Sequence, residues 1–124
     1  MTPAGAPAKV RRLCMQLPDA QETVSHGIPA FRITGGRMFA YVSHDHHGDG
    51  RTALLVKTAG REVAEHMITA DPERLYSPPY VGVAGWIGMH LLRADTDWGE
   101  IDDRIEASWQ LVAPQKLLKE REHG

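Results

Sequence analysis

The chain has a single cysteine and no long apolar run, and each shortage removes a class of protein. Its 124 residues contain only Cys14, which excludes an internal disulfide and a multi-cysteine zinc site and favours a reducing compartment. No apolar stretch approaches the roughly 18 residues of a membrane-spanning helix, and the first residues lack the apolar core of a signal peptide. We therefore expect a cytoplasmic protein with no membrane contact.

A large excess of charge of one sign is also missing, because the net charge is −2 at pH 7. The charge is nevertheless uneven. Residues 1–61 carry eight Lys or Arg and four Asp or Glu, whereas residues 62–124 carry six and twelve. Any contact with nucleic acid must therefore come from a local face built by the first half. Solvated helix surface explains the acidic second half.

Three segments have the apolar spacing of amphipathic helices. The first places Val10 and its i+3, i+4 and i+7 neighbours on one stripe and ends at Pro18. The second covers about 61–70. The third begins at Asp97, an expected N-cap with a glutamate three residues later, and continues to Pro114.

Strand patterns fill most of the remaining chain. The expected strands are 22–28, 30–34, 37–43, 52–58 and 86–92. Gly35-Gly36 would form a tight turn, after which residues 38, 40 and 42 would share one face and residues 39 and 41 the other. The segment from Tyr76 to Tyr80 contains two prolines and is expected to be irregular.

Sequential strands joined by short turns favour antiparallel pairing. The order of elements therefore predicts an α+β fold, in which helices cover one face of an antiparallel meander of about five strands. We expect one domain over residues 8–118, with tails at 1–7 and 119–124.

The loop before the 52–58 strand concentrates metal-capable side chains: His44, Asp45, His46, His47 and Asp49. His44 and His46 lie two positions apart, so an extended backbone would place both imidazoles on one side, with an aspartate as an oxygen ligand. One interpretation is a divalent-metal site. The other, which we favour, is a hairpin tip whose aspartates organise the turn, because adjacent histidines point to opposite sides and no further ligand is evident.

The strand region also carries the basic residues of the first half. If they share an uncovered sheet face, they would follow a phosphate backbone, while exposed aromatic rings would stack on bases or a planar ligand. The candidate contacts are Arg32, Arg37, Arg51, Lys57, Tyr80 and Trp86, with Tyr41 as a further exposed ring. The alternative is that Trp86 caps the core and Tyr80 packs under the proline turn.

Several motifs, taken in order, resemble the MmcQ/YjbR-like proteins over roughly residues 8–118. They are His26-Gly27-Ile28-Pro29-Ala30-Phe31, Gly35-Gly36-Arg37-Met38-Phe39-Ala40, Lys57, Pro78-Pro79-Tyr80-Val81-Gly82, Gly85-Trp86-Ile87 and Ser108-Trp109-Gln110-Leu111-Val112-Ala113-Pro114. The resemblance implies a frataxin-like (CyaY-like) α+β layer. It also implies a DNA-binding role with a "double wing" arrangement, whose wings would be the hairpins at 30–43 and 39–57. It implies no catalytic residue.

The sequence does not present a complete set of catalytic residues. Ser25 and His26 are neighbours, so on a strand their side chains would point to opposite faces, whereas a nucleophile and its base must converge. We expect a non-enzymatic binding module that contacts DNA or another anionic ligand through its sheet face and hairpin tips. The alternatives are a protein that binds a divalent metal or small ligand through the His-rich loop, and a domain that forms a homodimer through an open sheet edge or face.

Overall fold

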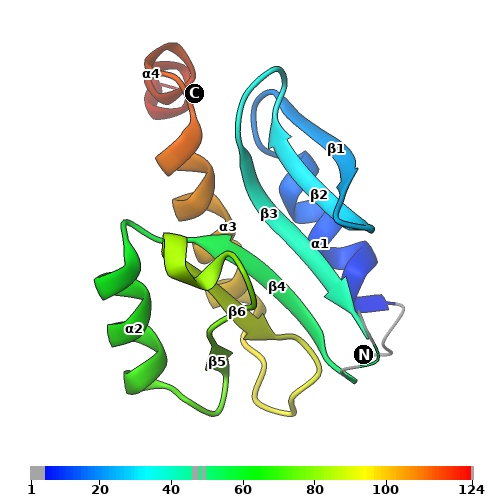
Figure 1. Cartoon of the computed structure of the whole chain (residues 1–124). Helices are drawn as coiled ribbons and strands as arrows, with labels where there is room; N and C mark the ends of the chain where they lie inside the picture. The colour runs from blue at the N-terminus through cyan, green and yellow to red at the C-terminus, as the bar shows by residue number, and fades with distance from the viewer. Residues whose placement is uncertain (1–4, 46–47, 49, 124) are drawn as a thin grey trace.

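The computed structural model describes residues 5–45, 48 and 50–123 (Figure 1). The elements, in order, are α1 (Gly5–Met15), β1 (Ala20–Ser25), β2 (Ile28–Ile33), β3 (Met38–His44), β4 (Thr52–Lys57), α2 (Arg61–Ala70), β5 (Leu75–Tyr76), the 3-10 helix η2 (Gly82–Ala84), β6 (Trp86–His90), α3 (Trp98–Val112) and α4 (Gln115–His123).

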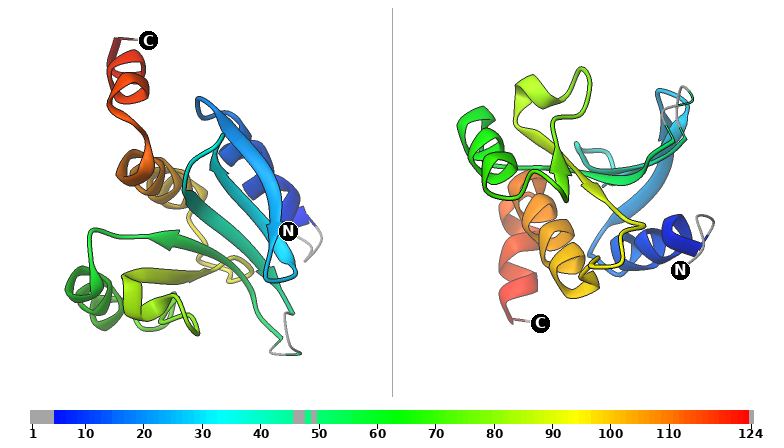
Figure 2. Two further views of the ribbon diagram at one scale, coloured as in Figure 1. Left: turned by 45° about the horizontal axis from the view of Figure 1, so that its top comes forward. Right: turned by 90° about the horizontal axis from the view of Figure 1, so that it is seen from below.

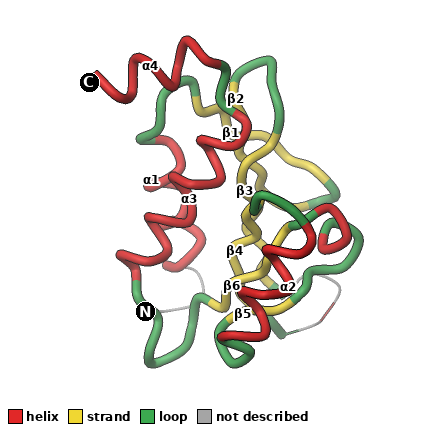
Figure 3. Tube along the Cα trace, turned by 90° about the vertical axis from the view of Figure 1, so that its left-hand side faces the viewer, coloured by secondary structure: helices red, strands yellow, loops and turns green. Residues whose placement is uncertain are grey.

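The strands form one antiparallel sheet of six, in the order β1-β2-β3-β4-β6-β5. Helices α1 and α3 lie together on one side of this sheet (Figure 3), and α2 lies beyond its β5–β6 edge (Figure 1). The α+β class, the antiparallel meander and the helical layer on one face are thus confirmed. The sheet has one strand more than expected because the short β5 pairs with β6.

The core fills the space between the sheet and the two helices of that layer. From α1 come Val10 and Cys14, and from α3 come Ile105 and Trp109, each with no exposed surface. Trp109 also donates a hydrogen bond from its indole Nε1 to the Pro18 carbonyl oxygen, at 3.0 Å. This bond fixes α3 against the chain segment that leaves α1. The Trp109 side chain is therefore buried, and its indole N–H still has a hydrogen-bond acceptor.

A β-bulge in β3 overturns part of the predicted strand pattern. The register between β2 and β3 shifts after Phe31, which pairs with Ala40, while Arg32 pairs with Met38. The extra residue leaves both Phe39 and Ala40 in the core, and Met38 moves to the other face. The expectation that Met38 would join Ala40 and that Phe39 would join Tyr41 was therefore wrong.

Both ends of the described chain are more helical than expected. Helix α1 already begins at Gly5, inside the predicted tail of residues 1–7, because Ala6 packs into the core. Helix α4 continues through the predicted tail at 119–124 as far as His123. It is fixed by Leu117, which is 7% exposed, and by the ion pair of Arg121 with Glu106. Among the described helices, none combines the length and apolar character needed to cross a membrane.

Candidate functional site

The side of the sheet opposite α1 and α3 carries no carboxylate at any described strand position. We call it the front face, because it is turned toward the viewer in Figure 1. Directly paired residues of antiparallel strands project to the same side, so the register assigns the members of this face. They are Gln21, Thr23, Ser25, Ile28, Ala30, Arg32, Met38, Tyr41, Ser43, Ala53, Leu55, Lys57, Tyr76, Trp86, Gly88 and His90. The one carboxylate within the strands, that of Glu22, lies on the helix side, where it pairs with Arg11.

One end of the front face is formed by Lys57, Trp86 and Tyr41. Lys57 pairs with Trp86 across β4 and β6, and the rings of Trp86 and Tyr41 lie 5.2 Å apart at an interplanar angle of 57°. Trp86 is only 7% exposed, so the expectation of an exposed ring was wrong at this position, because the tilted Tyr41 ring packs against it. Arg32, on β2, is partly exposed and its Nε donates to the Gln21 side-chain oxygen at 2.8 Å.

At the other end lie Tyr76 and His90 of the front face, with Arg51, the residue before β4, packed over the Tyr76 ring. The Arg51 guanidinium lies 4.3 Å from the centre of the Tyr76 ring, a cation–π geometry. Tyr76 in turn stacks on His90, with ring centres 5.0 Å apart. Partial burial and the positive charges of Arg51 and Arg93 lower the pKa of His90.

Glycine at position 88 makes this stack possible. A Cβ atom there would lie 2.4 Å from the Tyr76 ring, so the ring occupies the space that any other side chain would fill. Arg51, just before β4, and Lys57, at its end, are six residues apart in the chain. At about 3.3 Å per residue this separates their Cα atoms by roughly 20 Å.

A turn beside the Lys57 end holds Tyr80 in the solvent. Figure 2 shows the segment from β5 to β6 rising on the front side of the sheet. Its base is tied down because the Gly85 carbonyl oxygen accepts hydrogen bonds from the Thr58 amide and hydroxyl, at 2.9 and 2.6 Å. Tyr80 is 92% exposed and has a φ of +67°, which costs a residue with a side chain about 1–2 kcal/mol. The predicted packing of Tyr80 under the prolines is therefore wrong.

Arg37 is not a member of the front face. It lies in the turn between β2 and β3, where its Nη2 donates to the Leu111 carbonyl oxygen at 3.0 Å. A cation near the last carbonyls of a helix is favourable because the helix dipole is negative there. This candidate thus connects the β2–β3 turn to the end of α3.

The His-rich loop is described in part. His46, His47 and Asp49 lie outside the described residues. His44 Nδ1 lies 2.7 Å from the Thr52 hydroxyl, and Asp45 Oδ1 accepts from the Gly50 amide at 2.8 Å. Within the described part of the chain, no three His, Cys, Asp or Glu side chains come together as a metal site. The structure thus shows Asp45 in a turn-forming role. The metal site stays a prediction.

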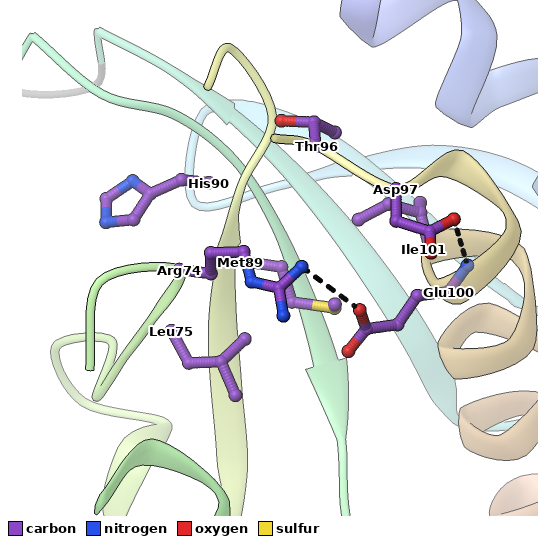
Figure 4. Close-up of a pocket in the computed structure, with 8 residues that line it drawn as sticks. All are labelled: Arg74, Leu75, Met89, His90, Thr96, Asp97, Glu100 and Ile101. Atoms are coloured by element: carbon purple, nitrogen blue, oxygen red, sulfur yellow. Dashed lines mark hydrogen bonds and ion pairs between the residues drawn. The ribbon is translucent and has the colours of Figure 1, made fainter. Parts of the chain in front are cut away.

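Two hollows are the best formed in the described protein, and both are small. The first, lined by Arg74, His90, Asp97 and Glu100 among others, holds about 10 Å³ (Figure 4). Its polar groups are engaged: Arg74 pairs with Glu100 at 3.6 Å, and Asp97 accepts from the Glu100 amide at 3.2 Å. This confirms Asp97 as an N-cap. Figure 4 shows the His90 ring directed away from these groups.

The second hollow holds about 150 Å³ between α1 and strands β1 to β3. Pockets for small molecules usually span about 300–1,000 Å³. Its lining is mostly apolar, with the ion-paired Arg11 and Glu22 among its residues. Neither of these two hollows therefore offers an enclosed site of ordinary ligand size.

The thiol of Cys14 does not provide a nucleophile. Burial raises the pKa of this thiol far above its usual value, and the negative charges of Glu22 and Asp102 raise it further. A reactive cysteine needs a lowered pKa and access to solvent. The packing role predicted from the helical stripe is confirmed, because Cys14 is fully buried in the core.

Two residues of the front face, Tyr76 and His90, were not among the predicted contacts. Alternation in the 86–92 strand predicts His90 on the same face as Trp86 and Gly88, and the structure confirms this; its ring was not, however, predicted to be a contact. Tyr76 was assigned to an irregular segment because Pro78 and Pro79 follow it. The prolines come after the two-residue strand, whose pairing with β6 requires no donor from them.

The comparisons place the chain among known proteins. A family model described as YjbR matches residues 15–111. Among solved structures, the Deinococcus radiodurans protein DR2400, described with a DUF419 domain, is similar with a TM-score of 0.69 and 21% identity, over 89% of this chain and 80% of that one. At this identity the likeness shows the fold alone. No curated protein matches the chain.

Proposed function

The chain belongs to the YjbR family, and from this premise we propose that it binds nucleic acid, without catalysing a reaction, through the front face and the Tyr80 turn. The observation that carries the proposal is the separation of charge in the sheet. At the described strand positions of the front face, every side chain that can carry a charge near neutral pH is basic, and the single carboxylate of the described strands is on the other side. Beyond these positions, Arg51 and Asp45 lie opposite each other at the ends of β4 and β3. A phosphate backbone is attracted to such a face even though the whole chain is slightly acidic.

The spacing of the cations suits an extended polyanion. The Cα atoms of Arg51 and Lys57 are separated by roughly 20 Å, a length over which one strand of B-form DNA presents about six phosphates. Arg32 adds a third cation across the sheet. The guanidinium groups offer two parallel donors to a phosphate, whereas Lys57 acts as a point charge.

Tyr80 supplies an aromatic surface for stacking. Its ring stands in solvent on a backbone that is strained, and such strain at an exposed residue is typical of positions that contact a ligand. Trp86 has a different role, because its buried ring supports Tyr41 and leaves no face free for a base. We therefore assign phosphate contacts to Arg32, Arg51 and Lys57, and a base contact to Tyr80.

The test is fluorescence anisotropy with labelled single-stranded and duplex DNA over a range of salt concentrations. Three phosphate contacts predict that log K falls with log salt with a slope of about −2 to −3. The triple variant Arg32→Gln, Arg51→Gln, Lys57→Gln should bind weakly at every sequence and lose most of that slope, by about 1 for each cation.

A matched control removes three cations on the helix side of the molecule. Arg12, Lys116 and Lys119 are exposed on α1 and α4, so Arg12→Gln, Lys116→Gln, Lys119→Gln changes the net charge by the same amount. This variant should keep its affinity and slope. No binding by the wild type at low salt, or equal losses in the two triple variants, would reject the proposal. Competition by inorganic phosphate as strong as by DNA would point to a small-anion site instead.

A further inference from the structure

The outer edge of β1 is the long unpaired edge of the described sheet. The sheet ends with β1 on one side and with the two-residue β5 on the other, and α2 lies beside β5 (Figures 1 and 2). An unpaired edge presents free N–H and C=O groups that can pair with another strand. The edge that can accept a strand is therefore that of β1.

The hairpin turn determines which backbone groups of β1 point outward. Its two central residues, His26 and Gly27, have φ values of +53° and +77°, as in a two-residue turn of type I′. Ser25 then exchanges hydrogen bonds with Ile28, and alternate residues of β1 do the same with β2. The N–H and C=O groups of Glu22 and Val24 consequently point away from β2, and no described residue bonds to them.

Pro29 fits this assignment. It lies opposite Val24, at a position where β2 does not need to donate to β1, so the missing N–H costs no bond there. The exposed side chains complete the edge. Val24 is 72% exposed, an apolar side chain without cover, whereas the Glu22 carboxylate is held by Arg11.

We propose that β1 pairs with β1 of a second copy of the chain, antiparallel about a two-fold axis at Thr23. In this register Glu22 faces Val24 of the second copy, and Thr23 faces its own equivalent. The two Glu22–Val24 pairs exchange four backbone hydrogen bonds, Val24 gains cover, a threonine pair forms at the axis, and no like charges lie directly opposite. A two-fold pairing of one strand with itself is the self-complementary contact of closed dimers.

The dimer does not depend on nucleic acid. It would join the two sheets into one, with the front faces of both copies on the same side. Arg32, whose side chain reaches Gln21 of β1, would then lie close to the axis in each copy.

The test is sedimentation equilibrium of the full chain, without nucleic acid, over a wide range of concentrations. The wild type should show a concentration-dependent dimer. Val24→Glu would place a carboxylate opposite Glu22 of the second copy twice in each dimer, and should raise the dissociation constant by about tenfold. Val24→Lys would place an ammonium group there instead, and should leave the dimer as tight or tighter.

Opposite effects of two charged substitutions at one site separate this register from a general effect of charge. Val83→Glu is the matched control, because Val83 is 70% exposed on η2, away from β1, and the dimer should persist. Circular dichroism checks that each variant is folded. A wild type that is monomeric at all concentrations, or equal effects of Val24→Glu and Val24→Lys, would overturn the proposal.

Discussion

The Ser108 hydroxyl donates a hydrogen bond to the Phe39 carbonyl oxygen across 2.6 Å. The same oxygen atom of Ser108 accepts from the Lys57 amide at 2.9 Å. One buried side chain of α3 therefore satisfies two backbone groups that the bulge in β3 leaves without a partner in the sheet. Ser108→Ala would leave both groups buried and unpaired, so we expect it to lower the free energy of unfolding by about 2–4 kcal/mol.

Urea denaturation monitored by circular dichroism measures this loss. Asp103→Asn is a suitable control, because Asp103 is exposed on the same helix and its change should stay within about 0.5 kcal/mol. A loss below about 1 kcal/mol for Ser108→Ala would show that the bulge finds other partners.

The bulge also marks where sequence patterns stop being informative. The α2 range, the N-cap at Asp97 and the alternation in β6 follow from local spacing and residue type, and the structure confirms them. The prediction for Phe39 was wrong because a bulge shifts the register, and the backbone groups beside it are bonded by Ser108, which is distant in the sequence. No local pattern records such a contact.

The candidate site, too, could be predicted from the sequence only in part. The register between the strands places Arg32, Lys57 and Trp86 on one face. Alternation within each strand could not predict this, because the three residues lie on different strands. It could not show that Tyr41 buries the Trp86 ring, or that Arg37 turns to the end of α3. Those outcomes depend on the curvature of the sheet and on which helix end lies nearby.

Gly85 is predicted to be the most restrictive glycine of the turn before β6. It has a φ of +91°, and a Cβ atom there would lie 2.7 Å from the Gly60 carbonyl carbon and 2.9 Å from its Cα. Because these are backbone atoms, they cannot move aside as the end of a side chain can. We expect Gly85→Ala to lower the free energy of unfolding by about 3 kcal/mol or more.

Gly35→Ala separates the cost of the positive φ from the cost of the steric contact with Gly60. Gly35 has a similar φ of +74°, with nothing within 4 Å of the added Cβ, so only the backbone cost of about 1 kcal/mol should appear. Thermal melts of the two variants give the difference. Equal losses of stability in Gly85→Ala and Gly35→Ala would mean that the contact with Gly60 relaxes without an energetic cost.

Addition of zinc should leave the melting temperature nearly unchanged. Within the described part of the chain, no three His, Cys, Asp or Glu side chains lie close enough to hold an ion, and a structural zinc site normally has four protein ligands. A ligand present at about 100 times its dissociation constant adds about 2.7 kcal/mol, which a thermal melt detects easily. A clear rise with zinc that is reversed by a chelator, and absent in a His44→Ala, His46→Ala variant, would instead establish the metal site.

His90 should make the protein less stable in mild acid. Its pKa is lowered from 6.5, so the unfolded chain binds this proton more readily than the folded protein. Its contribution to stability is therefore complete above pH 6.5, decreases as the pH falls from there toward the lowered pKa, and stays constant below it. His90→Gln should remove this part of the pH dependence in urea melts at pH 7.5 and 5.5.

NMR titration of the His90 ring provides the direct measurement. In the free protein its midpoint should lie below 6.5. Bound DNA should raise it, because phosphates beside Arg51 would offset the positive charge that disfavours protonation. The matched measurement with Arg51→Gln should give a smaller rise on binding, since that variant lacks the guanidinium expected to hold the phosphate. A free midpoint at or above 6.5 would contradict the arrangement of Arg51 and Arg93 around the ring, and an unchanged midpoint with DNA bound would place the nucleic acid away from this end of the front face.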